Sequence, residues 1–103
     1  MGSEMCIRDR YNNLLQDLNL QATSVPLLAG ELLNKDQNGK CASMNAIIAQ
    51  LPLTIPTAHV ISSLGCTGTA DGLHFNAAGY REIGKRYAAM MLHIMAYTIK
   101  AGN

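Results

Sequence analysis

Apolar residues follow two different spacings in the first half of the chain. Leucines recur at near-helical intervals within residues 11–21, which predicts the end of a helix there. Residues 25–30 form a continuous apolar run that stops at a glycine. A run of this length predicts a strand buried on both faces, as in a parallel sheet. Residues 42–51 again place apolar side chains on one helical face, and Pro52 and Pro56 are expected to close that helix.

The second half of the chain repeats this order. Residues 57–63 are rich in β-branched side chains and predict a second strand. A glycine-containing loop spans residues 64–75, and Asn76 is suited to cap a following helix. In that helix, apolar residues recur every three or four positions and charged residues fill the other face: Tyr80, Ile83, Tyr87, Met91 and Ile94. Alternating helices and strands predict an α/β fold with a parallel sheet.

The composition fits one small globular domain or a piece of a larger one, with 103 residues of which 49% are hydrophobic and 15% charged. The 8 basic and 7 acidic residues form no basic stripe, which argues against nucleic acid or an anionic membrane surface as a partner. The longest apolar stretch, residues 87–97, is interrupted by His93 and is shorter than the about 20 residues that a membrane span needs.

The cysteines Cys6, Cys41 and Cys66 lie too far apart for the close pairs of a zinc site, and no metal or other cofactor is expected. Cys41 and Cys66 could form a disulfide in an exported protein. The simpler alternative is two small buried hydrophobes, because free cysteine is among the most buried residue types.

The first ten residues differ in character from the rest. Residues 1–10 resemble the translated read-through of a sequencing adapter, and they lack the long apolar core of a signal peptide. We therefore expect an artefact at 1–10, a domain at 11–97 and a tail at 98–103. Two strands are too few for an independent sheet of this class, since a typical sheet has about five or six. The sequence thus predicts further strands upstream of residue 11.

Asp71 and His74 are the candidate catalytic residues. In acyl transfer, a histidine takes the proton of a nucleophilic hydroxyl, and a carboxylate on its other ring nitrogen fixes the tautomer. A spacing of three residues lets a tight turn bring the two side chains together. Their loop follows the second strand, at the carboxyl edge where open α/β sheets place active sites. The alternative is structural: Asp71 caps a turn and His74 packs at a helix entrance.

The other candidates are weaker. Serines are present, but none lies in a G-x-S-x-G nucleophile elbow: positions 3, 24, 43, 62 and 63. For Ser62 and Ser63, at a strand end, backbone pairing is the expected role. Cys66 precedes His74 by eight residues, but nothing nearby is expected to activate its thiol. Glu31 could touch substrate or simply begin a helix, and His59 is expected to be a core or edge residue.

The stretch from Asp71 to Tyr87 is more specific than its aspartate–histidine spacing alone. It resembles the terminal catalytic block of the SGNH (GDSL-like) hydrolase superfamily, and most closely the carbohydrate esterase family 6 acetylxylan esterases and the related sialate O-acetylesterase domain. Segments within 25–31, 39–52 and 56–65 also resemble later elements of that family, so the resemblance covers roughly residues 11–91.

This resemblance implies the C-terminal part of a three-layer α/β/α flavodoxin-like fold. It also implies serine-dependent, metal-free removal of acetyl groups, with His74 as general base and Asp71 as its orienting acid. The family's nucleophile block is not found here, so the chain alone is expected to be inactive. The full-length enzyme would be secreted or periplasmic, would act on acetylated polysaccharide or oligosaccharide, and could carry further catalytic or carbohydrate-binding domains.

Two alternatives stay open. One is another SGNH enzyme, such as a sialate O-acetylesterase, which would share the pair Asp71 and His74. The other is a small α/β interaction module without catalytic activity, in which the pair is incidental. Such a module should be self-sufficient and should expose no apolar sheet edge.

Overall fold

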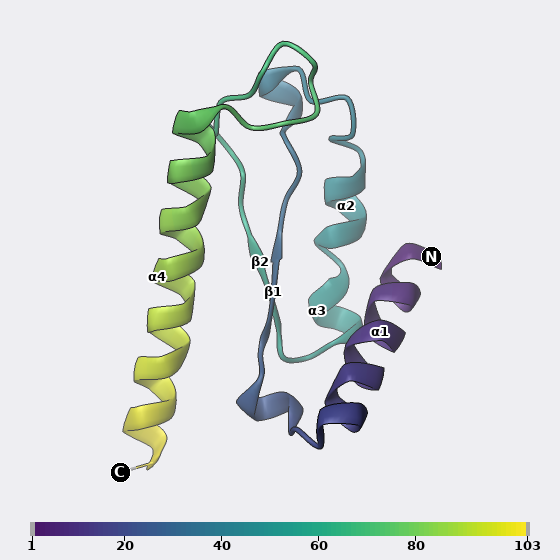
Figure 1. The fold of residues 1–103 in the computed structure, drawn as a ribbon, viewed down its shortest axis with the longest axis vertical. Helices are drawn as coiled ribbons and strands as arrows, with labels where there is room; N and C mark the ends of the chain where they lie inside the picture. Colours follow the sequence, from purple (N-terminus) through teal and green to yellow (C-terminus); the bar gives the residue numbers. More distant parts are fainter. Residues whose placement is uncertain (1, 103) are drawn as a thin grey trace.

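The computed structural model describes the backbone of residues 2–102 and the side chains of residues 5–96. Helices and strands alternate along this part of the chain, as the sequence predicts (Figure 1). The elements are α1 (Gly2–Leu18), the 3-10 helix η1 (Ala22–Ser24), β1 (Leu27–Gly30), the 3-10 helix η2 (Lys35–Gln37), α2 (Met44–Ile48), α3 (Leu51–Thr54), β2 (Ala58–Ile61) and α4 (Ala77–Gly102).

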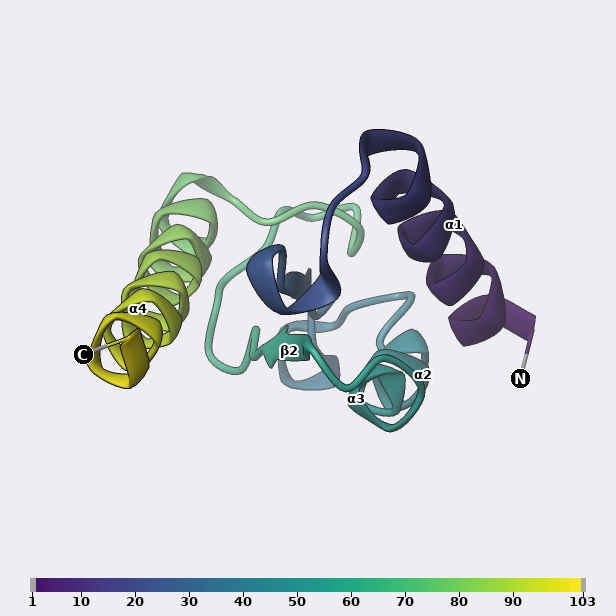
Figure 2. The same cartoon turned by 90° about the horizontal axis from the view of Figure 1, so that it is seen from below.

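The two strands form a parallel sheet that lies between two layers of helices. Leu27 of β1 aligns with Ala58 of β2, and the register continues to Gly30 and Ile61. Helix α4 lies on one side of the strands, and α1, α2 and α3 lie on the other (Figures 1 and 2). This arrangement confirms the predicted α/β class with a parallel sheet.

Each helical layer has its own cluster of buried side chains. On one side, Tyr11 packs with buried residues of α3 and β2 and of the turn between them: Leu51, Ile55 and Ala58. On the other side, Ile83 of α4 packs against Ile61 and Cys66, with Tyr87 beside them. The Tyr87 ring also lies close over β1, because a Cβ at Gly30 would lie 2.0 Å from its hydroxyl oxygen.

Helix α1 ends where the leucine spacing predicts. Asn19 adopts a left-handed conformation with φ of 55°, and its N–H bonds the Gln16 carbonyl while the Leu20 N–H reaches the Leu15 carbonyl. These two bonds are a Schellman motif, which satisfies carbonyls at the helix end. The helix also runs without a break through residues 2–10. At the other end of the chain, α4 continues through the predicted tail to Gly102, and Asn103 lies outside the described residues.

Two expectations about the elements are wrong. Residues 42–51 do not form one helix, because α2 ends at Ile48 and Pro52 lies in the first turn of the separate helix α3. Proline is tolerated there because the first helical N–H groups have no intrahelical partner. Strand β1 is half-buried rather than fully buried, since β2 is its one neighbour in the described sheet.

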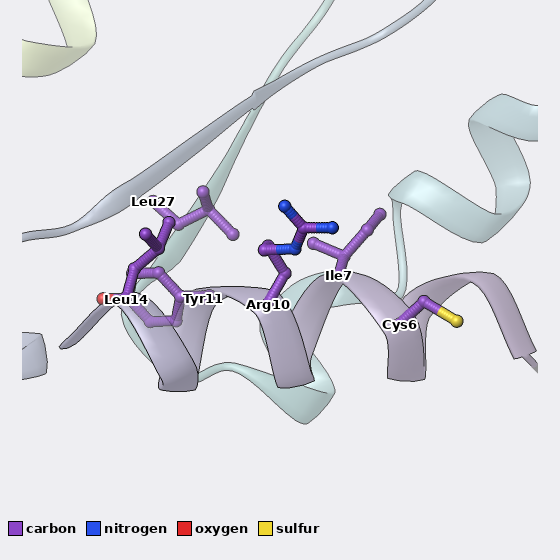
Figure 3. A pocket seen from close by; sticks show the side chains of 6 residues that line it. All are labelled: Cys6, Ile7, Arg10, Tyr11, Leu14 and Leu27. Carbon is purple, nitrogen blue, oxygen red and sulfur yellow. The ribbon is translucent and has the colours of Figure 1, made fainter. Parts of the chain in front are cut away.

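An apolar pocket of about 350 Å³ opens between α1 and β1. Figure 3 shows that its side chains come mostly from one face of α1, with Leu27 contributed by β1. Leu14 and Leu18 of the same helix are also exposed. The pocket is thus formed mainly by helix side chains and is not an open edge of the sheet.

Candidate active site

The loop between β2 and α4 forms a small hairpin at the carboxyl end of the strands (Figure 1). Gly68 and Phe75 form an isolated antiparallel bridge, and the Thr69 N–H donates to the His74 carbonyl oxygen at 2.9 Å. The hairpin leads into α4, where Phe75 meets Tyr80 edge to face with ring centroids 5.5 Å apart. These contacts hold the turn that carries Asp71 and His74.

Asp71 is the hydrogen-bonding centre of this turn. Its Oδ1 accepts bonds from the Leu73 N–H at 2.8 Å, the His74 N–H at 3.1 Å and the Thr69 hydroxyl. The Thr69 bond is the largest cause that holds the pKa of the Asp71 carboxyl well below its usual range, followed by the bond from the Leu73 amide. The carboxylate is therefore ionised at neutral pH.

The second oxygen of the same carboxylate holds His74. Nδ1 of His74 lies 2.6 Å from Oδ2 of Asp71, and the two side chains are 66% and 42% exposed. Because an ionised carboxylate can only accept, Nδ1 carries the hydrogen and Nε2 of the neutral ring is free to accept a proton. The turn-capping alternative is thus correct for one oxygen of Asp71, while the other oxygen orients the imidazole.

Contacts with the start of α4 hold the hairpin in place. Asn76 caps the helix as predicted, because its Oδ1 accepts from the Gly79 N–H at 2.8 Å and from the Thr67 hydroxyl at 2.8 Å. Gly79 presses against the first strand of the hairpin, since a Cβ there would lie 2.1 Å from the Thr67 carbonyl oxygen. His74 therefore sits two residues before a capped helix end.

The segment that follows β1 supports the hairpin from the side. Leu33 is 2% exposed, and a Cβ on Gly68 would lie 2.4 Å from one of its methyl groups. The Lys40 N–H donates to the Gly72 carbonyl oxygen at 2.8 Å. Gly72 has φ of 71°, a left-handed conformation that glycine adopts without strain.

Glu31 does not begin a helix, so the helix-start role expected for this residue is wrong. Its Oε1 accepts the Ser63 N–H at 2.8 Å, and so ties the end of β1 to the end of β2. The Ser63 hydroxyl donates to the Leu32 carbonyl at 2.6 Å and accepts from the Asn34 amide at 2.9 Å. These bonds hold Glu31 in extended chain rather than in a helical turn.

Asn34 and Asn45 are the members of this network that the sequence did not indicate. Asn45 is buried in α2, and its side-chain amide bonds both backbone groups of Leu32. Its Oδ1 accepts from the Leu32 N–H at 2.8 Å, and its Nδ2 donates to the Leu32 carbonyl at 3.0 Å. Both asparagines bond residues distant along the chain. One signal could have suggested the network: Glu31 and Ser63 each directly follow a predicted strand, and parallel strands end at the same edge.

Within residues 5–96, no serine or cysteine side chain is hydrogen-bonded to His74. Ser63 is fully buried, Cys66 is 1% exposed in the core, and Ser62 accepts a bond from the Leu64 N–H. The side chain of Ser3 lies outside the described residues. His59 is half-buried on β2, as expected for an edge or core residue.

Cys66 is the small buried hydrophobe that the sequence suggests, while Cys41 is exposed, and the two are not bonded to each other. Within residues 5–96, no three His, Cys, Asp or Glu side chains gather in a way that could hold a metal ion. Across the described part of the chain, none of the helices combines the length and hydropathy needed to cross a membrane.

The family model that matches this chain is described as carbohydrate esterase, sialic acid-specific acetylesterase, and the match covers residues 6–93. It begins at Cys6, ahead of Tyr11, and includes the whole Asp71–His74 hairpin. No solved structure matches the chain. The chain belongs to this family of carbohydrate esterases.

Proposed function

We propose that this family member uses His74 as a general base, oriented by Asp71, for serine-dependent removal of acetyl groups from carbohydrate. The observation that carries the proposal is the 2.6 Å bond between Nδ1 of His74 and Oδ2 of Asp71. This bond presents the opposite nitrogen, Nε2, on an exposed ring at the carboxyl edge of the sheet.

The chemistry of this arrangement is proton transfer during acyl transfer. A serine hydroxyl attacks the acetyl carbonyl carbon while Nε2 of His74 takes its proton. The ionised Asp71 stabilises the imidazolium, which then protonates the departing sugar oxygen. Water, deprotonated by the same nitrogen, attacks the acetyl-enzyme and releases acetate. The same two side chains therefore serve both half-reactions.

The nucleophile in this proposal is a serine other than those at positions 24, 43, 62 and 63. Ser63 is fully buried and its hydroxyl is already engaged with the Leu32 carbonyl and the Asn34 amide. The resemblance to SGNH hydrolases supports a separate serine block. The residues described here would then provide the acid–base half of the site.

The substrate class follows from the family and from the open position of His74. A side chain with 66% of its surface exposed can approach an acetyl group on a bulky glycan. Acetylated sialic acids are the substrates that the family description suggests. Acetylxylan, which the resemblance to family 6 esterases implies, is the second candidate, and secretion or periplasmic location would suit either glycan.

The test uses hydrolysis of p-nitrophenyl acetate by the whole chain. Without the nucleophile block the chain should not turn over carbohydrate esters, but with this activated ester His74 can activate water directly. We expect a slow protein-dependent rate that His74→Gln lowers by about tenfold or more, because general-base catalysis contributes at least that much. Asp71→Asn should also lower the rate, although the imidazole remains. His93→Gln is the matched control, since His93 is an exposed histidine on α4.

Two results would overturn the proposal. One is equal loss of rate in His74→Gln and His93→Gln, which would mean that any surface histidine acts on the ester. The other is an Asp71→Asn rate that equals the unsubstituted rate, which would leave Asp71 without a part in orienting the base.

A further inference from the structure

Lys40 lies against the turn that carries Asp71 and His74. Its N–H donates to the Gly72 carbonyl, and a Cβ on Gly72 would lie 3.0 Å from Cγ and 3.5 Å from Cδ of Lys40. The aliphatic stem therefore crosses the residue that directly follows Asp71. The ammonium nitrogen is two covalent bonds beyond Cδ, which keeps the charge close to this turn.

The backbone under Lys40 is firmly held. The Asn34 carbonyl accepts from the Gln37 N–H at 3.0 Å and from the Gly39 N–H at 2.9 Å, closing the segment on itself. A Cβ on Gly39 would lie 1.9 Å from the Leu33 carbonyl oxygen, so the chain packs tightly just before Lys40. Leu33 in turn is buried under Gly68 of the hairpin. The position of Lys40 thus depends on the same packing that positions His74.

The charge of Lys40 is not neutralised within the part of the chain that the structure describes. The ion pairs found there join Arg8 with Asp9, His74 with Asp71, and Arg86 with Glu82. Asp71 is the carboxylate of the hairpin, and its two oxygens already accept four bonds. Lys40 is also exposed. The carboxylate of a ligand would therefore be able to form an ion pair with the Lys40 ammonium.

We propose that Lys40 determines specificity by binding the carboxylate of an acidic sugar whose acetyl ester faces His74. This inference rests on the proposed function, and it selects acidic glycans over neutral ones such as acetylxylan. A neutral sugar offers no group of opposite charge to the ammonium. An acidic sugar pairs with Lys40 while its acetyl group meets Nε2 of His74.

The test compares N-acetylneuraminate with its neutral methyl ester, titrated into the whole ¹⁵N-labelled chain and followed by NMR. We expect the acid to bind about two- to fivefold tighter than the ester, the range expected for an exposed ion pair. Lys40→Gln should abolish this preference, because it keeps the backbone N–H and most of the aliphatic stem but removes the charge. Lys35→Gln is the matched control, since it removes the same charge from the same segment.

Equal affinity for acid and ester would overturn the role of Lys40, as would an equal effect of Lys35→Gln and Lys40→Gln or the absence of any binding. Hydrolysis of p-nitrophenyl acetate, a neutral ester, is measured on the same variants. If His74-dependent hydrolysis persists without an acid preference, the Lys40 inference fails alone. If that hydrolysis is absent, the proposed function fails.

Discussion

Two glycines on α4 should respond to alanine in opposite directions. A Cβ at Gly79 would lie 2.1 Å from the Thr67 carbonyl oxygen, whereas a Cβ at Gly84 would meet nothing within 4 Å. The backbone fixes the position of the added Cβ, and the atom that it meets is a backbone oxygen, so no side-chain rotation can relieve the clash. Either the first turn of α4 or the first strand of the hairpin must move by more than about 1 Å, given that atoms of this kind pack at about 3.5 Å.

The two substitutions should change the free energy of unfolding in opposite directions and for different physical reasons. Overpacking of this kind costs about 1–3 kcal/mol of unfolding free energy, which exceeds what alanine gains over glycine near a helix start. At Gly84 no clash opposes the gain, so Gly84→Ala should stabilise the chain by about 0.5–1 kcal/mol. Gly79→Ala should also slow His74-dependent ester hydrolysis, because Thr67 begins the hairpin that carries the histidine.

Urea denaturation followed by far-ultraviolet circular dichroism measures both variants against the unsubstituted chain. We expect the two midpoints to move in opposite directions with unchanged slopes. The packing argument is refuted if Gly79→Ala is as stable as Gly84→Ala. It is also refuted if Gly79→Ala loses stability while the hydrolysis rate stays unchanged, since the displacement would then spare the hairpin.

Two further predictions concern single hydroxyl groups. Tyr11→Phe should lower the unfolding free energy by about 1–2 kcal/mol, because the buried hydroxyl donates to the Val25 carbonyl and pairs with Thr57. Thermal unfolding measures this loss, and the exposed control Tyr80→Phe should show little change. Thr69→Val should raise the pKa of Asp71 toward its ordinary value of 3.8, which a ¹³C NMR titration measures. Thr23→Val is the control. Because that pKa is lowered in the folded state, its stabilising contribution is present above about pH 4 and is lost on acidification, so the variant should lose less stability in acid. An unshifted Asp71 titration in Thr69→Val would contradict the hydrogen-bond cause.

The features that the sequence predicted are those with local signals. Both strands, the Asn76 cap and the Asp71–His74 pair depend on residues within a few positions of one another. Glu31 and Ser63, in contrast, meet across 32 residues, and no periodicity reveals such a pair. The contact of Lys40 with Gly72 is hidden for the same reason. The break between α2 and α3 was missed because Pro52 starts a helix as readily as it ends one.

The four bonds to the Asp71 carboxylate span two or three residues in sequence. Closing so short a segment costs little chain entropy, so this turn can form early in folding, before β1 and β2 have met. Its placement on the sheet waits for slower, long-range steps. The internal geometry of the acid–base pair is therefore specified by six residues, 69–74. Its position on the sheet is specified by the rest of the chain. A hairpin of this kind could be moved to another scaffold with its internal geometry intact, but the direction in which Nε2 points would have to be rebuilt there.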